Sequence, residues 1–401
     1  MRHVFIGLSG GMGPIMRTAP IANYFQQAEV QVSFSAYGEY SLNILKQLGY
    51  GILPDEGTVA PSRAYALRPQ SQFYHLDHYF AQMGLLDKAF TAAWIRDRIA
   101  LLEKEKVDFV IADLSPHTLI AAKVLGIPAI SITQSCLHPD GKALYHWGSI
   151  PRNISMVTPV INEILSDYQL PSIDKIEDLN KADVNIMPSI PELDPVQHDD
   201  VVYVGPISMN MHENTSHAVA EDKPNILIYP GRMEDSTGLT GLNIIESVIH
   251  AFAKKAVNVI LATSETLPSH MQQSIPDNVT LVPYFNDDQL QHFQLYIHHG
   301  GHGSCLAAIQ HGVPSLIIPT HTEREFNARQ VYEMGIGEYV LPGTFTPDHL
   351  YQLCMYMMED QYKQRAMEWK KCLEERHYGG AQSVFFRAIQ LEKNNKKKAN
   401  P

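Results

Sequence analysis

Short, continuously apolar runs recur along this chain and alternate with stretches of helical pattern. His3–Leu8, Val107–Ala112, Asn225–Tyr229 and Val257–Ala262 are runs of this kind. A strand that is apolar on both faces is buried on both faces, which is typical of parallel sheets covered by helices. Strands that alternate with helices also imply right-handed crossover connections. We therefore expect an α/β protein built on doubly wound parallel sheets.

The chain is also long for a single core, because hydrophobic cores stop growing at about 250–300 residues. It has 401 residues, and the polar, aperiodic segment Met209–Lys223 separates two sets of alternating strands and helices. We predict an N-terminal Rossmann-like domain at 1–208, a linker at 209–223 and a second Rossmann-like domain at 224–375. A C-terminal helix at 376–392 and a basic tail at 393–401 are expected to follow.

Charge and composition exclude several classes of protein. The formal net charge of −12 argues against a nucleic-acid-binding face, which needs clustered basic side chains. No stretch approaches the ~18 apolar residues of a membrane span, so stable membrane insertion is not expected. The four cysteines lie far apart and form no CxxC pair, which indicates neither a zinc site nor a disulfide framework and suits the cytoplasm.

A glycine- and histidine-rich loop carries the strongest functional signal. The segment His298–Pro319 reads HHGGHGSCLAAIQHGVPSLIIP, in which a predicted strand, Leu295–His298, runs into a glycine turn and then a helix. Helix N-termini present free N–H groups with a partial positive charge, and glycines let an anion approach the backbone. The pattern predicts a pyrophosphate site at the carboxyl edge of a sheet. The alternative is an ordinary tight turn with incidental histidines.

These motifs resemble those of GT-B fold glycosyltransferases that use nucleotide sugars. The family is the superfamily of UDP-glycosyltransferases and bacterial antibiotic (macrolide, glycopeptide, enediyne) glycosyltransferases, whose usual pattern is HHGGxGT, GVPxxxxP, an acidic–Gln pair and NAxxxxxxGxG. Its later elements fall in register here at Gly312–Pro314, Pro319, Asn327–Ala328 and Gly335/Gly337. Weaker matches occur at Tyr203–Pro206, Leu281–Phe285, Lys106–Asp113 and Leu125–Pro128. The resemblance implies two Rossmann-like domains facing across a cleft, with the C-terminal helix crossing back onto the first.

The resemblance also implies an activity. We expect an inverting glycosyltransferase that moves a hexose from a UDP- or dTDP-sugar to a small hydrophobic or aromatic acceptor, as in natural-product and antibiotic biosynthesis. No metal and no cofactor beyond the nucleotide sugar are expected, and homodimerisation is left open. The alternative is a non-catalytic, glycosyltransferase-like auxiliary protein.

The donor side of the cleft is assigned to the C-terminal domain by resemblance. Diphosphate-binding residues are expected at Gly231, Arg232, His299, Gly301, Gly303 and Ser304. Nucleoside-binding residues are expected at Pro283 and Tyr284, and sugar-binding residues at Glu323 and Arg324. For three side chains a structural role competes: His298 and His302 as packing or capping residues, and Arg232 as a partner of Glu234 or Asp235.

Two donor positions depart from the family pattern. The family usually carries a glutamate for the ribose hydroxyls eight residues after the phosphate histidine, and here that position is Ala307. The acidic–Gln pair that contacts the sugar is Glu323–Arg324 instead. Glu323 can still accept hydrogen bonds from sugar hydroxyls, whereas Arg324 suggests either an unusual sugar or a salt bridge to Glu325.

The usual catalytic base is missing. Aligning the first glycine loop, Gly10–Arg17, with the family places Pro14 at the position of the base, and proline cannot take a proton. Proline does suit the first turn of a helix. We predict Asp113 as the replacement, acting directly or through His117, with His138, His75 and His78 as further candidates, and a structural role as the alternative for each. An acceptor that is already nucleophilic would need no base.

The acceptor is expected to lie on the N-terminal domain. The side chains predicted to line its site are Met12, Pro14, His75, His78, Tyr79, Met83 and His138. The aromatic stretch at 60–90 could equally be the core of two helices.

Overall fold

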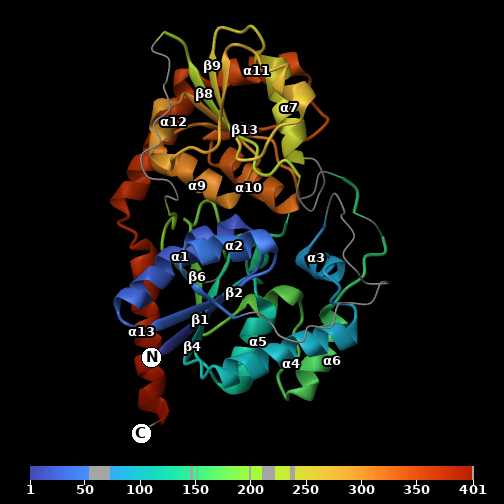
Figure 1. Cartoon of the computed structure of the whole chain (residues 1–401), viewed down its shortest axis with the longest axis vertical. Coiled ribbons are helices and arrows are strands. Elements are labelled where there is room, and N and C mark those ends of the chain that lie inside the picture. Colours follow the sequence, from blue (N-terminus) through green and yellow to red (C-terminus); the bar gives the residue numbers. More distant parts are fainter. Residues whose placement is uncertain are drawn as a thin grey trace.

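The computed structural model describes residues 1–53, 73–144, 148–150, 152–197, 200–209, 222–234 and 240–399. These residues form two parallel sheets, one above the other along the long axis of the molecule (Figure 1). The strand order is β3-β2-β1-β4-β5-β6-β7 in the first sheet and β10-β9-β8-β11-β12-β13 in the second. Helices cover both faces of each sheet. The predicted GT-B architecture of two Rossmann-like domains is confirmed.

The first sheet is built from the apolar runs of the N-terminal half. Its strands are β1 (His3–Leu8), β2 (Gln31–Ser35), β3 (Gly51–Ile52), β4 (Phe109–Asp113), β5 (Ala129–Ile132), β6 (Val184–Met187) and β7 (Val201–Tyr203). The helices are α1 (Met12–Gln27), α2 (Glu39–Gln47), α3 (Leu76–Gln82), α4 (Lys88–Lys104), α5 (Pro116–Leu125) and α6 (Thr158–Asp167), with 3₁₀ turns η1 (Ser135–Leu137) and η2 (Ile176–Asn180). All six residues of β1 are buried, because helices cover both of its faces.

The second sheet is built from the apolar runs of the C-terminal half. Its strands are β8 (Asn225–Tyr229), β9 (Asn258–Ala262), β10 (Val279–Val282), β11 (Leu295–His298), β12 (Ser315–Ile317) and β13 (Gly337–Tyr339). The helices are α7 (Thr240–Phe252), α8 (Ser269–Gln272), α9 (His302–His311), α10 (Thr322–Glu333), α11 (Pro347–Met357), α12 (Asp360–Glu375) and α13 (Gly380–Ala399), with the 3₁₀ turn η3 (Asp287–His292). Most of the segment predicted as the linker, 210–221, lies outside the described residues.

The last helix returns to the first domain. In Figure 1, α13 runs alongside α1, and the Phe385 ring lies 5.0 Å from that of Phe25. Val384 and Ala388 are fully buried in the core of the first sheet. The helix continues to Ala399, so the basic residues from Lys393 onward extend α13 rather than forming a separate tail.

The β6–β7 connection of the first domain is embedded in the second. Ile190 and Leu193 are almost completely buried and pack with Leu306 and Ile309 of α9 and with Val331 of α10. This apolar contact fixes the start of α9 against the first domain. The loop that connects β11 to α9 therefore lies where the two domains meet.

Candidate active site

The β11–α9 turn has the backbone geometry that its glycines permit. Gly300 has a φ of +88°, and a Cβ there would lie 2.8 Å from the carbonyl oxygen of Arg324. The Gly300 N–H donates to His298 Nδ1 at 3.1 Å, and its carbonyl accepts from Asn327 Nδ2 at 2.9 Å. A side chain at this position would therefore break both the backbone conformation and the packing.

The turn leaves several backbone donors unused. Among the described residues, none accepts a hydrogen bond from the N–H groups of Gly301, His302, Gly303 or Ser304. A Cβ at Gly303 would meet no atom within 4 Å. Free N–H groups and the positive end of a helix dipole favour an anion at this place. The predicted diphosphate loop thus has both the donors and the space.

The histidines that precede α9 are held neutral. Burial lowers the pKa of His298 to about 3, and burial together with Arg324 and His298 lowers the pKa of His299 well below its usual range. The His299 ring lies edge-on to Tyr229, with its Nδ1 3.5 Å from the Tyr229 carbonyl oxygen. A neutral His299 has a single N–H and brings no positive charge; with that proton on Nδ1 facing Tyr229, its Nε2 could donate to phosphate only after a change of tautomer.

The β8–α7 loop reaches the same place. Gly231 has a φ of +77°, and a Cβ there would lie 3.0 Å from the His299 ring. The exposed Arg232 guanidinium lies 4.5 Å from the centre of the Tyr40 ring, which belongs to the first domain. Arg232 makes no ion pair with Glu234 within the described part of the chain, while Asp235 lies outside it. The β8–α7 loop thus brings Gly231 against His299 and leaves Arg232 exposed near the domain interface.

The predicted sugar-binding pair lies directly behind the glycine turn. Asn327 bridges the Gly300 carbonyl and Glu323 Oε1, the latter at 2.9 Å. Arg324 donates to the Thr320 hydroxyl. The anticipated Arg324–Glu325 bridge is absent, because Glu325 accepts from Arg329 at 2.5 and 2.8 Å.

The nucleoside side contains an acid that sequence reasoning missed. Pro283 and Tyr284 follow β10, and the next residue, Phe285, packs edge-on to Tyr229 at 5.7 Å. Asp287, at the start of η3, is half-buried and makes no hydrogen bond or ion pair to a described residue. Burial and the neighbouring Asp288 raise its pKa to about 6. Ala307 packs into an apolar cluster with Leu290 and Tyr296, so it offers a nucleoside no polar group.

The two residues predicted as catalytic both have partners. Asp113 accepts from Arg17 Nε at 2.5 Å and from Arg17 Nη2 at 2.8 Å, a bidentate ion pair that sequence reasoning also missed. His117 is fully buried, bonds the Tyr37 hydroxyl at 2.8 Å and stacks on Trp94 at 3.8 Å. The catalytic role of each remains a prediction, and the geometry gives each a structural partner.

The predicted acceptor residues fall into two groups around the first domain. Pro14 is buried in the first turn of α1, beside the half-buried Met12. His75 caps α3 by accepting from the His78 N–H at 3.0 Å. Tyr79 and Met83 lie on or just after α3, and Phe73 before it meets His321 of the second domain at 5.8 Å between rings. The described part of the aromatic stretch, from Phe73 onward, therefore borders the donor domain, while residues 60–72 lie outside the described residues.

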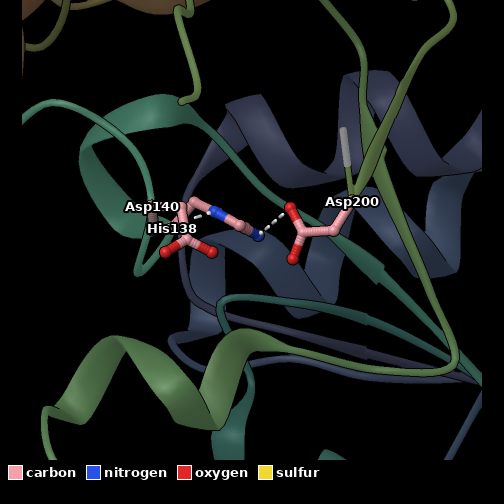
Figure 2. Close-up of side chains that lie close together, drawn as sticks. All are labelled: His138, Asp140 and Asp200. Atoms are coloured by element: carbon pink, nitrogen blue, oxygen red, sulfur yellow. Dashed lines mark hydrogen bonds and ion pairs between the residues drawn. The ribbon is translucent and has the colours of Figure 1, made fainter. Parts of the chain in front are cut away.

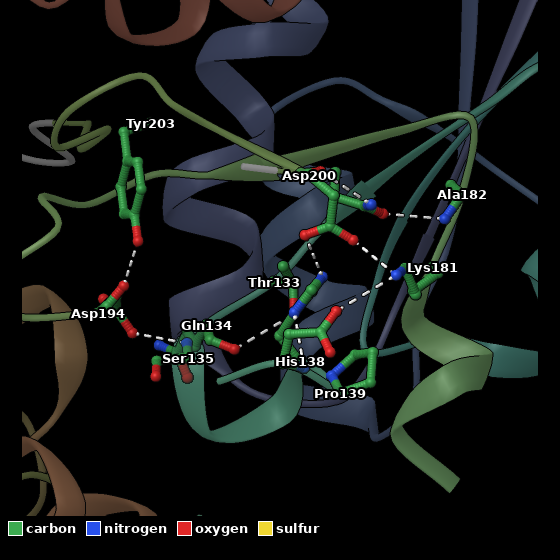
Figure 3. A network of polar contacts seen from close by, with 12 residues as sticks. Thr133, Gln134, Ser135, His138, Pro139, Lys181, Ala182, Asp194, Asp200 and Tyr203 are labelled. Atoms are coloured by element: carbon green, nitrogen blue, oxygen red, sulfur yellow. Dashed lines mark hydrogen bonds and ion pairs between the residues drawn. The ribbon is translucent and has the colours of Figure 1, made fainter. Parts of the chain in front are cut away.

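His138 lies in a separate polar cluster, shown in Figure 2. Its Nδ1 accepts from the Asp140 N–H at 3.2 Å, so Nε2 carries the proton and points towards Asp200 Oδ1, 3.5 Å away. Lys181 contacts Asp200 at 2.6 Å (Figure 3). It also contacts Asp140, at 3.4 Å. The three side chains are close enough to hold a cation, but the ammonium of Lys181 already supplies that charge and Nε2 has no free lone pair. These residues do not fit a metal as they stand.

Comparison with known proteins agrees with this geometry. Residues 246–374 match the family described as the C-terminal domain of erythromycin biosynthesis protein CIII-like proteins. The NDP-glycosyltransferase YjiC of Bacillus subtilis is 25% identical over 311 residues, which cover 75% of this chain and 76% of YjiC. The TDP-daunosamine transferase DnrS of Streptomyces peucetius is 31% identical over 129 residues, 28% of its length.

Solved structures resemble the whole chain. The calicheamicin glycosyltransferase CalG4 has a TM-score of 0.74 at 16% identity and covers 97% of this chain and 98% of its own. The glycosyltransferase of kitacinnamycin has a TM-score of 0.73 at 18% identity, covering 97% and 99%. At such identities these structures support the fold alone.

Two facing Rossmann-like domains with a glycine turn at the interface form the GT-B architecture. The family match and the sequence relatives support a glycosyltransferase of the superfamily that contains the UDP-glycosyltransferases and bacterial antibiotic glycosyltransferases. No helix among the described residues is long and apolar enough to cross a membrane.

Proposed function

We propose that this enzyme transfers a sugar from a UDP- or dTDP-sugar to a small natural-product acceptor, with inversion and without a metal. The free N–H groups of 301–304 carry this proposal, because they form an unoccupied set of donors at a helix N-terminus. Relatives named as an NDP-glycosyltransferase and a TDP-daunosamine transferase support a nucleotide-sugar donor.

The leaving group would be stabilised by fixed dipoles rather than by a bound ion. The amides of Gly301, Gly303 and Ser304 would contact the diphosphate, with Arg232 closing from the β8–α7 loop. His299 would add a further donor in the tautomer that carries its proton on Nε2. Preorganised donors of this kind stabilise charge as it develops on the leaving oxygen. Glu323 would accept hydrogen bonds from sugar hydroxyls, held in place by Asn327.

The nucleoside would lie against Pro283 and Tyr284. Its sugar hydroxyls would donate to Asp287, whose carboxylate is the unpaired acceptor on this side of the site. An accepted hydrogen bond would favour the ionised carboxylate and lower its raised pKa. This role for Asp287 holds for ribose and deoxyribose alike, since both keep a 3′-hydroxyl.

The acceptor would bind between α3 and the second domain, where Phe73 and Tyr79 approach His321. A cytoplasmic location suits the four cysteines, none of which forms a disulfide. A homodimer is compatible with this arrangement but is not required by it.

Calorimetric titration with UDP, dTDP and GDP tests the donor site first. We expect binding of UDP or dTDP at micromolar concentrations with no added metal and in the presence of EDTA. Release of the same nucleotide from its glucose or rhamnose conjugate, measured with a panel of phenolic and macrolide acceptors, then tests transfer. If none of the three nucleotides binds, the proposal is wrong.

A non-catalytic auxiliary protein is the second candidate. It is favoured by Pro14 at the usual base position and by the pairing of Asp113 with Arg17. This reading predicts nucleotide binding too weak to measure and a stable complex with a second glycosyltransferase. Tight nucleotide binding by the isolated chain would count against it.

A further inference from the structure

The third histidine of the glycine loop is held by the opposite domain. His302 Nε2 lies 2.7 Å from Asp194 Oδ2, and the two side chains are 5% and 0% exposed. Asp194 belongs to the β6–β7 connection, whereas His302 is the first residue of α9. This buried pair therefore connects the acceptor domain directly to the diphosphate loop.

The surroundings of Asp194 fix it as an ionised acceptor. Its Oδ1 accepts from the Ser135 N–H at 2.8 Å, and its backbone carbonyl accepts from the Tyr203 hydroxyl at 2.5 Å. Figure 3 shows Asp194 between these two residues. Burial opposes the charge, but attraction to His302 and the hydrogen bonds outweigh it and lower the pKa of this carboxyl. The carboxylate thus faces His302 as a fixed negative charge.

The position of His302 on α9 directs its ring towards the expected anion. Side chains in the first turn of a helix lean towards its N-terminus, which here is the end with the free N–H groups. Nε2 is taken by Asp194, while Nδ1 bonds no described residue and is not among the fully buried polar atoms. The neighbouring Gly303 faces open space. Nδ1 is therefore the polar atom of this ring that can reach a phosphate oxygen.

The other charged groups around His302 are already engaged. Arg17 is bound to Asp113, and Arg324 donates to Thr320 and lies near His299. Glu323 on α10 is bonded by Asn327. Burial raises the pKa of the thiols of Cys136 and Cys305 well above the usual range, so both stay neutral. His302 is the side chain here that keeps a ring nitrogen, Nδ1, without a described partner.

We propose that His302, positioned by Asp194, takes up a proton when the nucleotide diphosphate binds and donates from Nδ1 to a phosphate oxygen. The inference rests on the proposed donor site. An imidazole between a carboxylate and a diphosphate is favoured in its cationic form, because both neighbours are negative. Asp194 would hold the ring and balance its charge without itself taking the proton.

The transfer step balances with this arrangement. The acceptor oxygen forms a bond to the anomeric carbon, and the bond from that carbon to the β-phosphate oxygen breaks with its electron pair going to the diphosphate. The hydrogen bond from imidazolium Nδ1 strengthens as that negative charge develops. The acceptor proton is lost to solvent or to a base on the acceptor side, and His302 gives up its own proton when the nucleotide leaves.

Proton uptake can be measured with the nucleotide alone. We would titrate dTDP and UDP into the full chain at pH 8 in several buffers of different ionisation enthalpy. At this pH a terminal phosphate is already almost fully ionised, since its second pKa is about 6. The wild type should take up a substantial fraction of a proton, and His302→Gln should take up none. We expect His302→Gln to bind about 10- to 100-fold more weakly at pH 6.5, the size of one charge-assisted hydrogen bond.

The matched control is His311→Gln, at the far end of the same helix. It should keep both the affinity and the proton uptake. His302→Gln retains an amide that can donate to Asp194, so the hydrogen bond between the domains survives. The variant Asp194→Asn tests the partner and should reduce the proton uptake.

Equal proton uptake in the wild type and His302→Gln would overturn the inference. Absence of any nucleotide binding by the wild type would instead overturn the donor site itself.

Discussion

Two glycine turns occupy equivalent places in the two domains, yet they leave different runs of backbone N–H groups without a partner. In both, a central parallel strand runs into a turn and then a helix, β1 to α1 and β11 to α9. At α9 the four N–H groups of 301–304 have no described partner. At α1 the Gly11 N–H donates to Ser41 Oγ at 2.9 Å and Pro14 has no N–H to offer, which leaves those of Met12 and Gly13 without a described partner. The β11–α9 turn therefore offers an anion the longer unbroken run of free donors.

The charged residues near the two turns differ in the same way. Arg17 of α1 is locked onto Asp113, so the first turn carries a neutral pair. His302 of α9 is held by Asp194 through one nitrogen and keeps the other available. The two turns thus differ in how many polar groups they leave available to an anion.

Adding a carboxylate at each turn should give the largest difference in nucleotide affinity between the two turns. Gly303→Asp should abolish nucleotide binding, weakening it by more than about 100-fold, because a carboxylate would occupy the anion site. The fold should tolerate the change, since the Cβ meets no atom and an acid suits the first helical turn. Calorimetry with dTDP and thermal unfolding measure the two effects.

Gly13→Asp is the matched change in the first domain. Its Cβ would lie 3.5 Å from Arg17 Nη1, an ordinary contact. Nucleotide affinity should stay within about twofold of the wild type, because the donor site lies in the other domain. A similar loss of affinity in both variants would show that the turns are not functionally distinct.

Breaking the Arg17–Asp113 pair should cost stability. Arg17 is 14% and Asp113 2% exposed at the side chain, so Arg17→Met leaves a buried carboxylate without its partner. We expect the free energy of unfolding to fall by about 3 kcal/mol, the lower end for a broken buried pair. Urea unfolding measures it. The double variant with Asp113→Asn should recover part of the loss; no recovery would mean that the two residues act independently.

Asp287→Asn should weaken nucleotide binding while making the folded protein more stable at high pH. The pKa of Asp287 in the fold, about 6, lies above its ordinary 3.8, so the fold favours the protonated form and loses stability as pH rises through 6. The amide should therefore stabilise the protein at pH 8 by about 1 kcal/mol, after discounting for partial exposure, and have no effect at pH 4. Nucleotide binding should weaken at the same time.

Asp288, the exposed neighbour of Asp287, supplies the control for the Asp287→Asn experiment. Asp288→Asn should leave nucleotide affinity unchanged, since its side chain lies at the surface. If Asp287→Asn binds dTDP as tightly as the wild type, Asp287 does not contact the nucleoside.

The smallest effect is expected at the rim of the domain interface. Arg376 pairs with Glu192 at 2.6 Å, but both side chains are about 30% exposed. Arg376→Ala should lower the free energy of unfolding by about 0.5–1 kcal/mol. Raising the salt concentration should reduce the difference from the wild type. A loss as large as that of Arg17→Met would place this ion pair among the main stabilising contacts.

The sequence predicts most of the strands, because they are short runs rich in apolar residues. Strand β13, with the sequence GEY, has no such pattern and was not predicted. The glycine loop is also visible, since its spacing marks a strand-to-helix turn. Asp194 was missed because it lies more than a hundred residues from His302 and in no motif, and only the packed interface brings the two together. Arg17 was missed for a similar reason, since it is partnered by Asp113 on β4, 96 residues along the chain. Local patterns do not reveal such long-range partners.

The embedding of Ile190 and Leu193 in the second domain bears on how this enzyme could be re-engineered. A chimera that exchanges whole domains at the linker would remove these side chains from the hollow formed by Leu306, Ile309 and Val331. It would also separate Asp194 from the histidine it holds. A chimera designed to change the acceptor should therefore take residues 189–196 from the same parent as its C-terminal domain. This short stretch packs as part of that domain despite its position in the chain.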